Sequence, residues 1–164
     1  MAQKIILGID PGIADTGYGL IKLVPGKNPE CVAYGSIKTS LKFDLPTRLV
    51  QLAKELNGII KKYQPEAVAI EQLFFNKNVK TALVVGQARG VALLILKQNA
   101  LPIYEFTPGQ VKQAVSCYGK ADKKQVQKMV KMLLRLKEIP QPDDAADALA
   151  MALTLSATNL WPKN

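Results

Sequence analysis

Short apolar runs along the chain are typical of β-strands. KIILGID at 4–10 is apolar until it ends in an acid before a Pro-Gly pair, which predicts a buried strand stopped by a turn. TGYGLIKLV at 16–24 and CVAYGSIKTS at 31–40 alternate like strands around the turn-forming PGKNPE, so we expect strands one to three to form an antiparallel meander. Two further predicted strands lie at 65–75 and 101–106.

Other segments carry apolar residues at helical spacing. Pro46 and Pro108 stand near the start of two of them, and Thr107 is the expected N-cap of the second. The predicted helices cover 47–63, 81–99, 107–119, 120–137 and 143–158. Three strands followed by alternating helix and strand predict an α/β fold, a five-stranded mixed sheet flanked by helices, in a single domain spanning 1–164.

The long helix at 81–99 is apolar on nearly every side. Such a helix is typical of a core, so we expect it to be mostly buried. The same composition would also suit the interface of a dimer, for which the segment from about Asn78 to Gln98 is the candidate. The pattern alone leaves both interpretations open.

The charge of the chain favours a polyanionic partner. Lys and Arg outnumber Asp and Glu by 22 to 13, which gives a net charge of +9. This favours nucleic acid, although charge alone would also suit an acidic protein or a membrane surface. Arg occurs only at 48, 89 and 135. Because bidentate reading of guanine relies on Arg, we expect phosphate contacts by Lys instead.

The absence of His narrows the possible chemistry. Without His the chain has no imidazole base and no Ser-His or Cys-His nucleophile, so any metal would be held by oxygen ligands, which suit Mg²⁺ or Mn²⁺. Two distant Cys residues fit a reducing compartment. The first apolar run is too short for a signal peptide and no later run is expected to span a membrane, which predicts a cytoplasmic protein.

Two acids end buried strands. Asp10 closes the first predicted strand and Glu71 closes the apolar part of the fourth. Asp10 alone could be a turn-capping carboxylate before Pro11-Gly12. If the two strands are neighbours, however, both carboxylates meet at one rim of the sheet, where functional sites form in α/β folds.

The last predicted helix, in PQPDDAADALAMAL, carries further acids on an apolar background. Asp143 follows Pro142 and is expected to be the N-cap, a role that Asp144 could share. Asp147 lies beyond the first exposed turn, and a buried carboxylate is costly without a compensating charge. We therefore expect a divalent metal as its counter-ion.

Four carboxylates on a Lys-rich chain suit the hydrolysis of phosphodiesters. Two magnesium ions between the carboxylates could activate a water and stabilise the leaving 3′ oxygen without a His base. The surrounding basic residues would hold the substrate strand.

The motifs ILGIDPG, TGYG, AIEQLFF, GQARG, QVKQ and DDAADALAMAL, in this order, resemble the RuvC family of bacterial Holliday junction resolvases, within the ribonuclease H-like superfamily. GIDPG also resembles the phosphate loop of actin-like ATPases. That fold requires a second nucleotide-binding half, for which 164 residues leave little room.

The resemblance implies a ribonuclease H-like fold and a homodimer. The implied activity is that of a crossover junction endodeoxyribonuclease in recombination and DNA repair. It would make paired nicks in strands of like polarity at a four-way junction, leaving 5′-phosphate and 3′-hydroxyl ends. Two Mg²⁺ per active site, replaceable by Mn²⁺, and the branch-migration proteins RuvA and RuvB are the implied cofactors and partners.

The resemblance also implies site residues. The catalytic, metal-binding carboxylates would be Asp10, Glu71, Asp144 and Asp147. Phe74 matches an aromatic residue that stacks on an unpaired base, although core packing is the alternative for Phe74 and is favoured for Phe75. DNA-contacting lysines would be Lys112 and Lys123, with Lys77, Lys120 and Lys124 as weaker candidates, although a solvated surface role is the alternative for each.

A binding module that keeps the fold and charge without cutting DNA is a second hypothesis. Loss of one or more acids would be its signature in the sequence. All four are present.

Overall fold

A single mixed β-sheet organises the molecule. The computed structural model describes residues 3–73, 79–158 and 160. Its strands lie in the order β3-β2-β1-β4-β5, with β1 antiparallel to β2, β2 antiparallel to β3, and β4 parallel to both β1 and β5. They are β1 (Lys4–Asp10), β2 (Asp15–Leu23), β3 (Glu30–Lys38), β4 (Ala67–Glu71) and β5 (Ile103–Phe106). The predicted meander and five-stranded mixed sheet are therefore confirmed.

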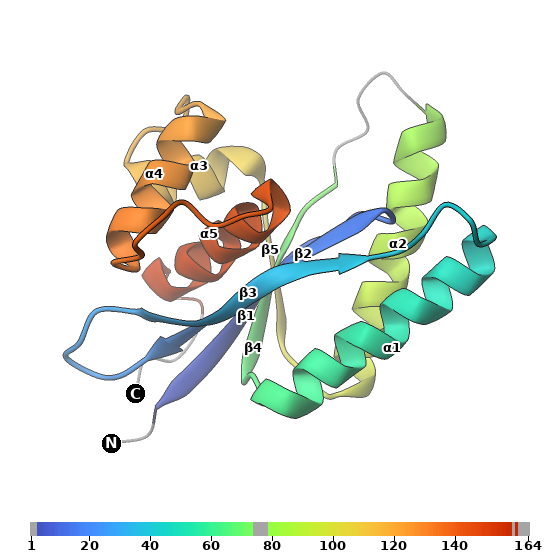
Figure 1. The fold of residues 1–164 in the computed structure, drawn as a ribbon. Coiled ribbons are helices and arrows are strands. Elements are labelled where there is room, and N and C mark those ends of the chain that lie inside the picture. The colour runs from blue at the N-terminus through green and yellow to red at the C-terminus, as the bar shows by residue number, and fades with distance from the viewer. Residues whose placement is uncertain (1–2, 74–78, 159, 161–164) are drawn as a thin grey trace.

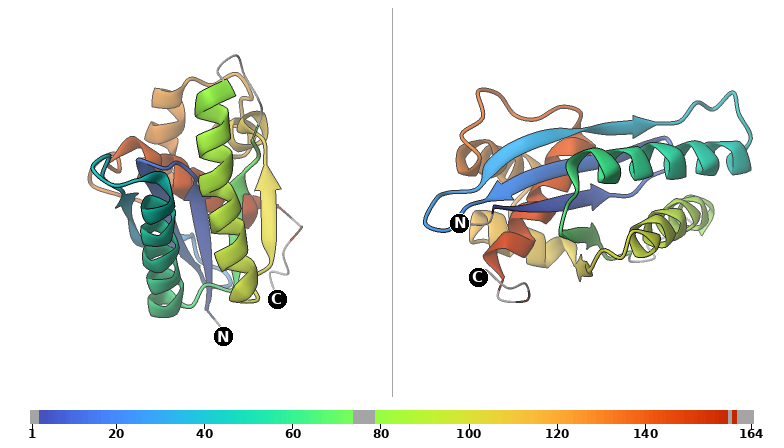
Figure 2. Two further views of the ribbon diagram at one scale, coloured as in Figure 1. Left: turned by 90° about the vertical axis from the view of Figure 1, so that its right-hand side faces the viewer. Right: turned by 90° about the horizontal axis from the view of Figure 1, so that it is seen from below.

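Helices cover both faces of the sheet. One face carries α1 and α2 and the other carries α5, with α3 and α4 outside it (Figures 1 and 2). Each face has its own cluster of buried apolar side chains. The helices are α1 (Leu45–Tyr63), α2 (Val79–Gln98), α3 (Pro108–Ser116), α4 (Lys123–Leu133) and α5 (Asp143–Ala157).

The ends of the helices follow local capping. Thr107 caps α3 as predicted, its side chain accepting a hydrogen bond from the backbone of Gln110. The predicted start of α4 at 120 is wrong, because Asp122 and Gln125 form a capping box that begins the helix at Lys123. Beyond its end, Arg135 has φ 51°, a left-handed conformation that stops the predicted continuation to 137.

The expectation that the helix at 81–99 is mostly buried is wrong. Within α2, only Ala88, Ala92 and Leu96 are buried, on the stripe that faces the sheet and α1. Val79 and Leu83 on the outer side are 81% and 61% exposed. An apolar helix therefore presents an uncovered face.

By length and composition α2 is also long and apolar enough to cross a membrane, contrary to the expectation that no run reaches that length. One such helix is weak evidence. Arg89 within it forms an ion pair with Glu105 of β5, which ties the helix to the sheet.

Helix α5 packs directly on the backbone of β1 and β2. A Cβ atom at Gly8 would lie 1.8 Å from the carbonyl oxygen of Ala148, and one at Gly17 would lie 2.0 Å from that of Asp144. No side chain larger than hydrogen fits at either contact without displacing α5. These two glycines therefore set the distance between the sheet and the helix that carries the late acids.

We predict that Gly8→Ala lowers the free energy of unfolding by about 3 kcal/mol, because the added methyl group meets backbone that cannot move aside. This corresponds to a fall of roughly 6–12 °C in Tm for a chain of this size. The measurement is thermal unfolding followed by circular dichroism. Gly58→Ala is the control, since a Cβ there meets nothing within 4 Å and should stabilise α1 slightly. Equal stability of Gly8→Ala and the wild type would contradict the role given to this contact.

Candidate active site

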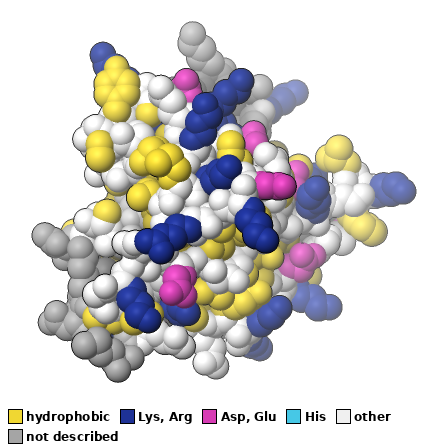
Figure 3. All heavy atoms as spheres, turned by 60° about the vertical axis from the view of Figure 1, so that its left-hand side comes forward, with side chains coloured by type: hydrophobic (Ala, Val, Ile, Leu, Met, Phe, Trp, Pro, Cys, Tyr) yellow, Lys and Arg dark blue, Asp and Glu magenta, His cyan; other side chains and the backbone are white. Residues whose placement is uncertain are grey.

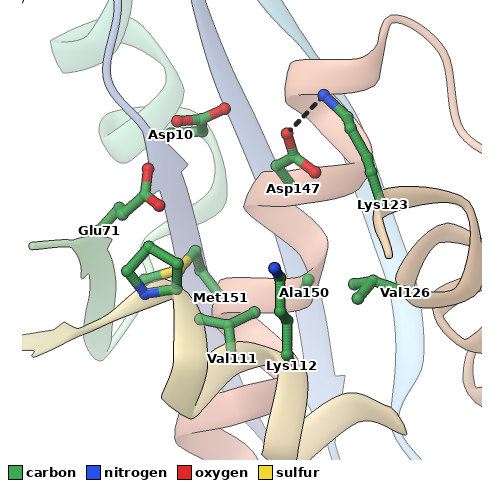
Figure 4. A pocket seen from close by; sticks show the side chains of 10 residues that line it. Asp10, Glu71, Val111, Lys112, Lys123, Val126, Asp147, Ala150 and Met151 are labelled. Atoms are coloured by element: carbon green, nitrogen blue, oxygen red, sulfur yellow. Dashed lines mark ion pairs between the residues drawn. The ribbon is translucent and has the colours of Figure 1, made fainter. Parts of the chain in front are cut away.

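Four carboxylates converge at one end of the sheet. Asp10 and Glu71 are the last residues of the neighbouring strands β1 and β4, and Asp144 and Asp147 lie one turn apart near the start of α5. One oxygen each from Asp10, Asp144 and Asp147 lie within 4.8 Å of one another. Glu71 lines the same pocket as Asp10 and Asp147, and Figure 4 shows the three turned toward a common space. The expected meeting of the acids at one rim is thus present.

The pocket beneath the acids is a cavity of about 180 Å³ with an apolar floor. Val111, Val126 and Met151 form much of that floor. Lys112 from α3 and Lys123 from α4 enter the same pocket (Figure 4). Positive side chains therefore lie beside a cluster of negative ones. The apolar wall lowers the local dielectric constant, which strengthens the electrostatic interaction between them.

Burial makes the ionisation of Asp10 unfavourable. Loss of solvation first, and then the charges of Glu71, Asp147 and Asp144, raise the pKa of Asp10 from 3.8 to about 8, while Lys123 opposes the shift. Without an added cation the site therefore retains a proton near neutral pH.

The neighbouring acids are shifted in the same direction. Burial and the charge of Asp147 raise the pKa of Glu71, although a hydrogen bond with Asp10 lowers it. Burial also raises the pKa of Asp147, against the opposing influence of Lys123. The cluster therefore carries more negative charge than its own environment can stabilise, which is the condition that attracts a cation.

One cation is already present. The ammonium Nζ of Lys123 lies 3.1 Å from Asp147 Oδ2 and 3.4 Å from Asp143 Oδ2. Partial burial lowers the pKa of Lys123, but its hydrogen bonds and ion pairs with these two acids raise it overall. The expectation that a metal alone would balance Asp147 overlooked this ammonium, because the spacing along the chain did not show that α4 reaches α5.

The role expected for Asp143 is wrong. Pro142 is the N-cap residue of α5 and makes no side-chain capping bond, so Asp143 is the first residue inside the helix. Asp143 Oδ1 instead accepts a hydrogen bond of 3.2 Å from Nε2 of Gln127, a buried side chain of α4. Asp143 therefore joins α5 to α4 beside the pocket.

Arg89 fixes the backbone at Glu71. Its Nε donates a hydrogen bond of 3.2 Å to the carbonyl oxygen of Glu71, and its guanidinium also bonds the Glu105 carboxylate. The sequence reasoning missed this positioning residue. Its only signal was an Arg at the centre of an otherwise apolar helix, within GQARG.

The turn after Asp10 is held by two threonines. The Thr16 hydroxyl donates to the carbonyl of Gly12, and the Thr39 hydroxyl donates to that of Ile13. Buried Arg48 in turn donates from Nε to Thr39 at 3.0 Å. These bonds restrain the chain immediately after the first acid.

The remaining predicted site residues lie farther out or outside the described part of the chain. Lys120 and Lys124 are exposed near the start of α4 and are not among the residues that line the pocket. Phe74, Phe75 and Lys77 lie outside the described residues.

The carboxylate cluster fits a divalent cation with oxygen ligands. Mg²⁺ holds its ligands at 2.0–2.1 Å, which separates opposite oxygens by roughly 4.2 Å. The oxygens of Asp10, Asp144 and Asp147 are within 4.8 Å of one another, so a small contraction suffices. The proton retained by Asp10 would leave on binding, as is usual when a carboxylate becomes a ligand.

Comparison with known proteins gives consistent matches. The family model described as crossover junction endodeoxyribonuclease RuvC matches residues 6–155. A protein of that name from Caldicellulosiruptor saccharolyticus is 57% identical over 148 residues, which cover 90% of this chain and 89% of the relative. Another, from Heliobacterium modesticaldum, is 52% identical over 157 residues and 96% of each chain.

Solved structures agree. T. thermophilus RuvC in complex with a Holliday junction substrate matches with a TM-score of 0.88 and 35% identity, over 93% of each chain. The yeast mitochondrial Holliday junction resolvase Ydc2 matches with a TM-score of 0.67 at 16% identity, over 93% of this chain and 77% of the other, and this supports the fold alone. The ribonuclease H-like fold is thereby confirmed.

We predict that Asp10→Asn stabilises the metal-free protein more at pH 8.5 than at pH 5.5. Because the folded pKa of Asp10 is raised to about 8, wild-type stability is lost as pH rises from about 4 to about 8, and a neutral amide avoids this loss. The gain at pH 8.5 should exceed the gain at pH 5.5 by about 3 kcal/mol, or roughly 6–12 °C in Tm.

The measurement is thermal unfolding in EDTA at both pH values. Glu138→Gln, at an exposed acid between α4 and α5, controls for the loss of one negative charge. A gain from Asp10→Asn that is the same at pH 5.5 and 8.5 would contradict the interpretation.

Proposed function

This chain belongs to the RuvC family of crossover junction endodeoxyribonucleases, and from that membership we propose that it resolves Holliday junctions in recombination and DNA repair. It hydrolyses one phosphodiester bond in each of two strands of like polarity and leaves 5′-phosphate and 3′-hydroxyl ends. The observation that carries the proposal is the meeting of Asp10, Glu71, Asp144 and Asp147 in a pocket shared with two lysines. The related T. thermophilus protein, solved with a Holliday junction substrate, supports four-way DNA as the substrate.

Two Mg²⁺ ions, for which Mn²⁺ can substitute, are the proposed cofactors. Asp10, Asp144 and Asp147 would hold a metal together, because one oxygen from each lies within 4.8 Å of the others, and the charge of Glu71 also acts on Asp10. When bound, such a pair of ions activates the attacking water and stabilises the leaving oxygen. The donor set supports this choice, since every candidate ligand is a carboxylate oxygen.

The protein's own side chains position the substrate. Lys112 and Lys123 hold the oxygens of the scissile phosphate by charge, since both line the pocket that contains the acids. Val111 and Met151 close the floor, which limits bulk water to the open side. Glu71, fixed through its backbone by Arg89, keeps its carboxylate directed at the reacting centre.

The wider surface supports DNA binding. On the face drawn in Figure 3, Lys and Arg side chains lie scattered among apolar ones and are more frequent than Asp and Glu. Lys120 and Lys124, both exposed, are placed to contact phosphates next to the pocket. Stacking of Phe74 on an unpaired base and a phosphate contact by Lys77 are proposed from the family resemblance.

The protein acts as a homodimer, in which two active sites serve the two strands. The exposed apolar face of α2, made by Val79, Leu83 and Leu94, is the proposed interface. A Cβ atom at Gly86 or Gly90 would meet nothing within 4 Å, so packing against the described residues of one copy does not explain these glycines. Two bare glycines one turn apart suit the close approach of a second helix.

The cellular setting follows from the substrate. We place the protein in the cytoplasm, where bacterial DNA is accessible, with RuvA and RuvB as branch-migration partners. These assignments depend on the family and on the proposed substrate.

We predict that Asp144→Asn and Glu71→Gln each lower junction cleavage by at least about a hundredfold while junction binding persists, because each removes negative charge from the metal site without changing side-chain size. The measurement is cleavage of a labelled mobile four-way junction in Mg²⁺, in Mn²⁺ and in EDTA. Linear duplex of the same sequence is the substrate control, and Glu138→Gln is the protein control.

Paired nicks in opposing strands of the junction alone, abolished by EDTA, would support the proposal. Junction binding by the wild type without any cut would favour a noncatalytic binding module instead. Equal cutting of the linear duplex would leave a nuclease without junction specificity.

We predict that Leu83→Glu converts the dimer into a monomer and abolishes paired cutting while single nicks persist, because a buried unpaired charge at the interface is costly. Sedimentation velocity gives the oligomeric state, and two-strand cutting in a cruciform plasmid gives the coupling. Leu41→Glu is the matched control, since Leu41 is 83% exposed on the loop before α1. A Leu83→Glu protein that remains dimeric would exclude this face.

A further inference from the structure

Lys123 is held between two carboxylates of different character. Asp147 belongs to the acid cluster of the pocket. Asp143 lies outside the residues that line the pocket, and its side chain is 56% exposed. The Lys123 ammonium spans the two at 3.1 Å and 3.4 Å, as the dashed line to Asp147 shows in part (Figure 4).

The two carboxylates that Lys123 contacts, Asp147 and Asp143, differ in what else they can bind. Asp147 faces Asp10 and Asp144 within metal-ligand range, so a cation in the cluster uses the same Asp147 carboxylate as the ammonium. Asp143 has its other oxygen occupied by Gln127, whose side chain is buried and comes from the same helix as Lys123. Asp143 is therefore fixed in place and is not a member of the cluster.

We propose that Lys123 is a resident cation of the metal-free site, displaced from Asp147 when a metal binds, and that Asp143, held by Gln127, then retains its ammonium at the edge of the pocket, where the scissile phosphate arrives. This rests on the proposed nuclease function. Metal binding and phosphate binding are thereby linked, because the same event that fills the cluster frees one of the donors of Lys123. Asp143 and Gln127 act through Lys123 and are positioning residues.

The linkage has a direct consequence for metal affinity. A metal that enters the wild-type site must break the contact between Lys123 and Asp147. This contact is weak because the side chains of Lys123 and Asp147 are 51% and 34% exposed. Removal of the ammonium should strengthen metal binding by roughly twofold to fivefold. Removal of another positive charge from the same pocket should have a smaller effect, because that charge has no ion pair to give up.

The first experiment is a calorimetric titration of the metal-free, full-length protein with Mn²⁺ in the absence of DNA. Lys123→Met should bind Mn²⁺ roughly twofold to fivefold more tightly than the wild type. Lys112→Met is the matched control, because Lys112 lines the same pocket and no ion pair is found for it among the described residues. If the two substitutions change the Mn²⁺ affinity equally, Lys123 acts only through its positive charge in the pocket, and the proposal is overturned.

The second experiment tests the positioning role with all charges unchanged. In Gln127→Met the side-chain length is kept but the hydrogen bond to Asp143 is lost. We expect unchanged Mn²⁺ affinity, which also reports an intact site, and a fall of roughly fivefold in kcat for junction cutting at saturating metal. Unchanged kcat with unchanged affinity would overturn the part given to Asp143 and Gln127.

A spectroscopic readout separates this inference from the proposed function. The ¹⁵N resonance of the Lys123 ammonium, identified by its loss in Lys123→Met, should shift when Mg²⁺ is added without DNA. A resonance that does not move while Mg²⁺ binds would overturn the displacement, even in a protein that cuts junctions. A shift in a protein that cuts no junction would support the displacement and count against the proposed function alone.

Discussion

The contact between α5 and the glycines of β1 and β2 is the constraint on which the site depends. An α-helix normally packs on a sheet through side chains, at a distance set by their bulk. Here the backbone of Ala148 and Asp144 approaches positions where no Cβ exists. Because α5 lies so close to the strands, carboxylates from its first two turns reach the end of β1. If α5 packed farther from the strands, the chain would contain the same four acids, but their carboxylates would no longer meet.

This close packing also concentrates charge. The acids meet over an apolar floor, so each lies in an environment that disfavours its ionised form. The structure limits the cost in two ways without any bound ion, since Asp10 keeps a proton and Lys123 approaches Asp147. A divalent metal can replace both, because the proton on Asp10 and the flexible Lys123 ammonium bind the carboxylates less strongly than the metal does. The site is thus stable enough to fold and still open to its cofactor.

The sequence predicted much of this architecture because the relevant signals are local. Strand ends at Asp10 and Glu71 and the unusual acids of an apolar helix are visible in single segments, and neighbouring parallel strands necessarily bring their ends together. The failures involve contacts between segments. That Lys123 would balance Asp147, and that Asp143 would bond Gln127 instead of capping its helix, depends on how α4 lies against α5. Likewise, the apolar composition of α2 could not show which of its faces the sheet leaves uncovered.

Helix α2 takes part in two different contacts. Its outer face is exposed, and its Arg89 side chain holds the end of β4. The outer side carries exposed apolar residues, while Arg89 on the same helix donates a hydrogen bond to the carbonyl oxygen of Glu71. A helix is stiff along its axis, so a small rotation or slide of α2 would move the end of β4 through Arg89 and displace the Glu71 carboxylate. If two copies associate through α2, the catalytic geometry of each becomes sensitive to the presence of the other. A nuclease built in this way would reach full activity only after its second copy has bound.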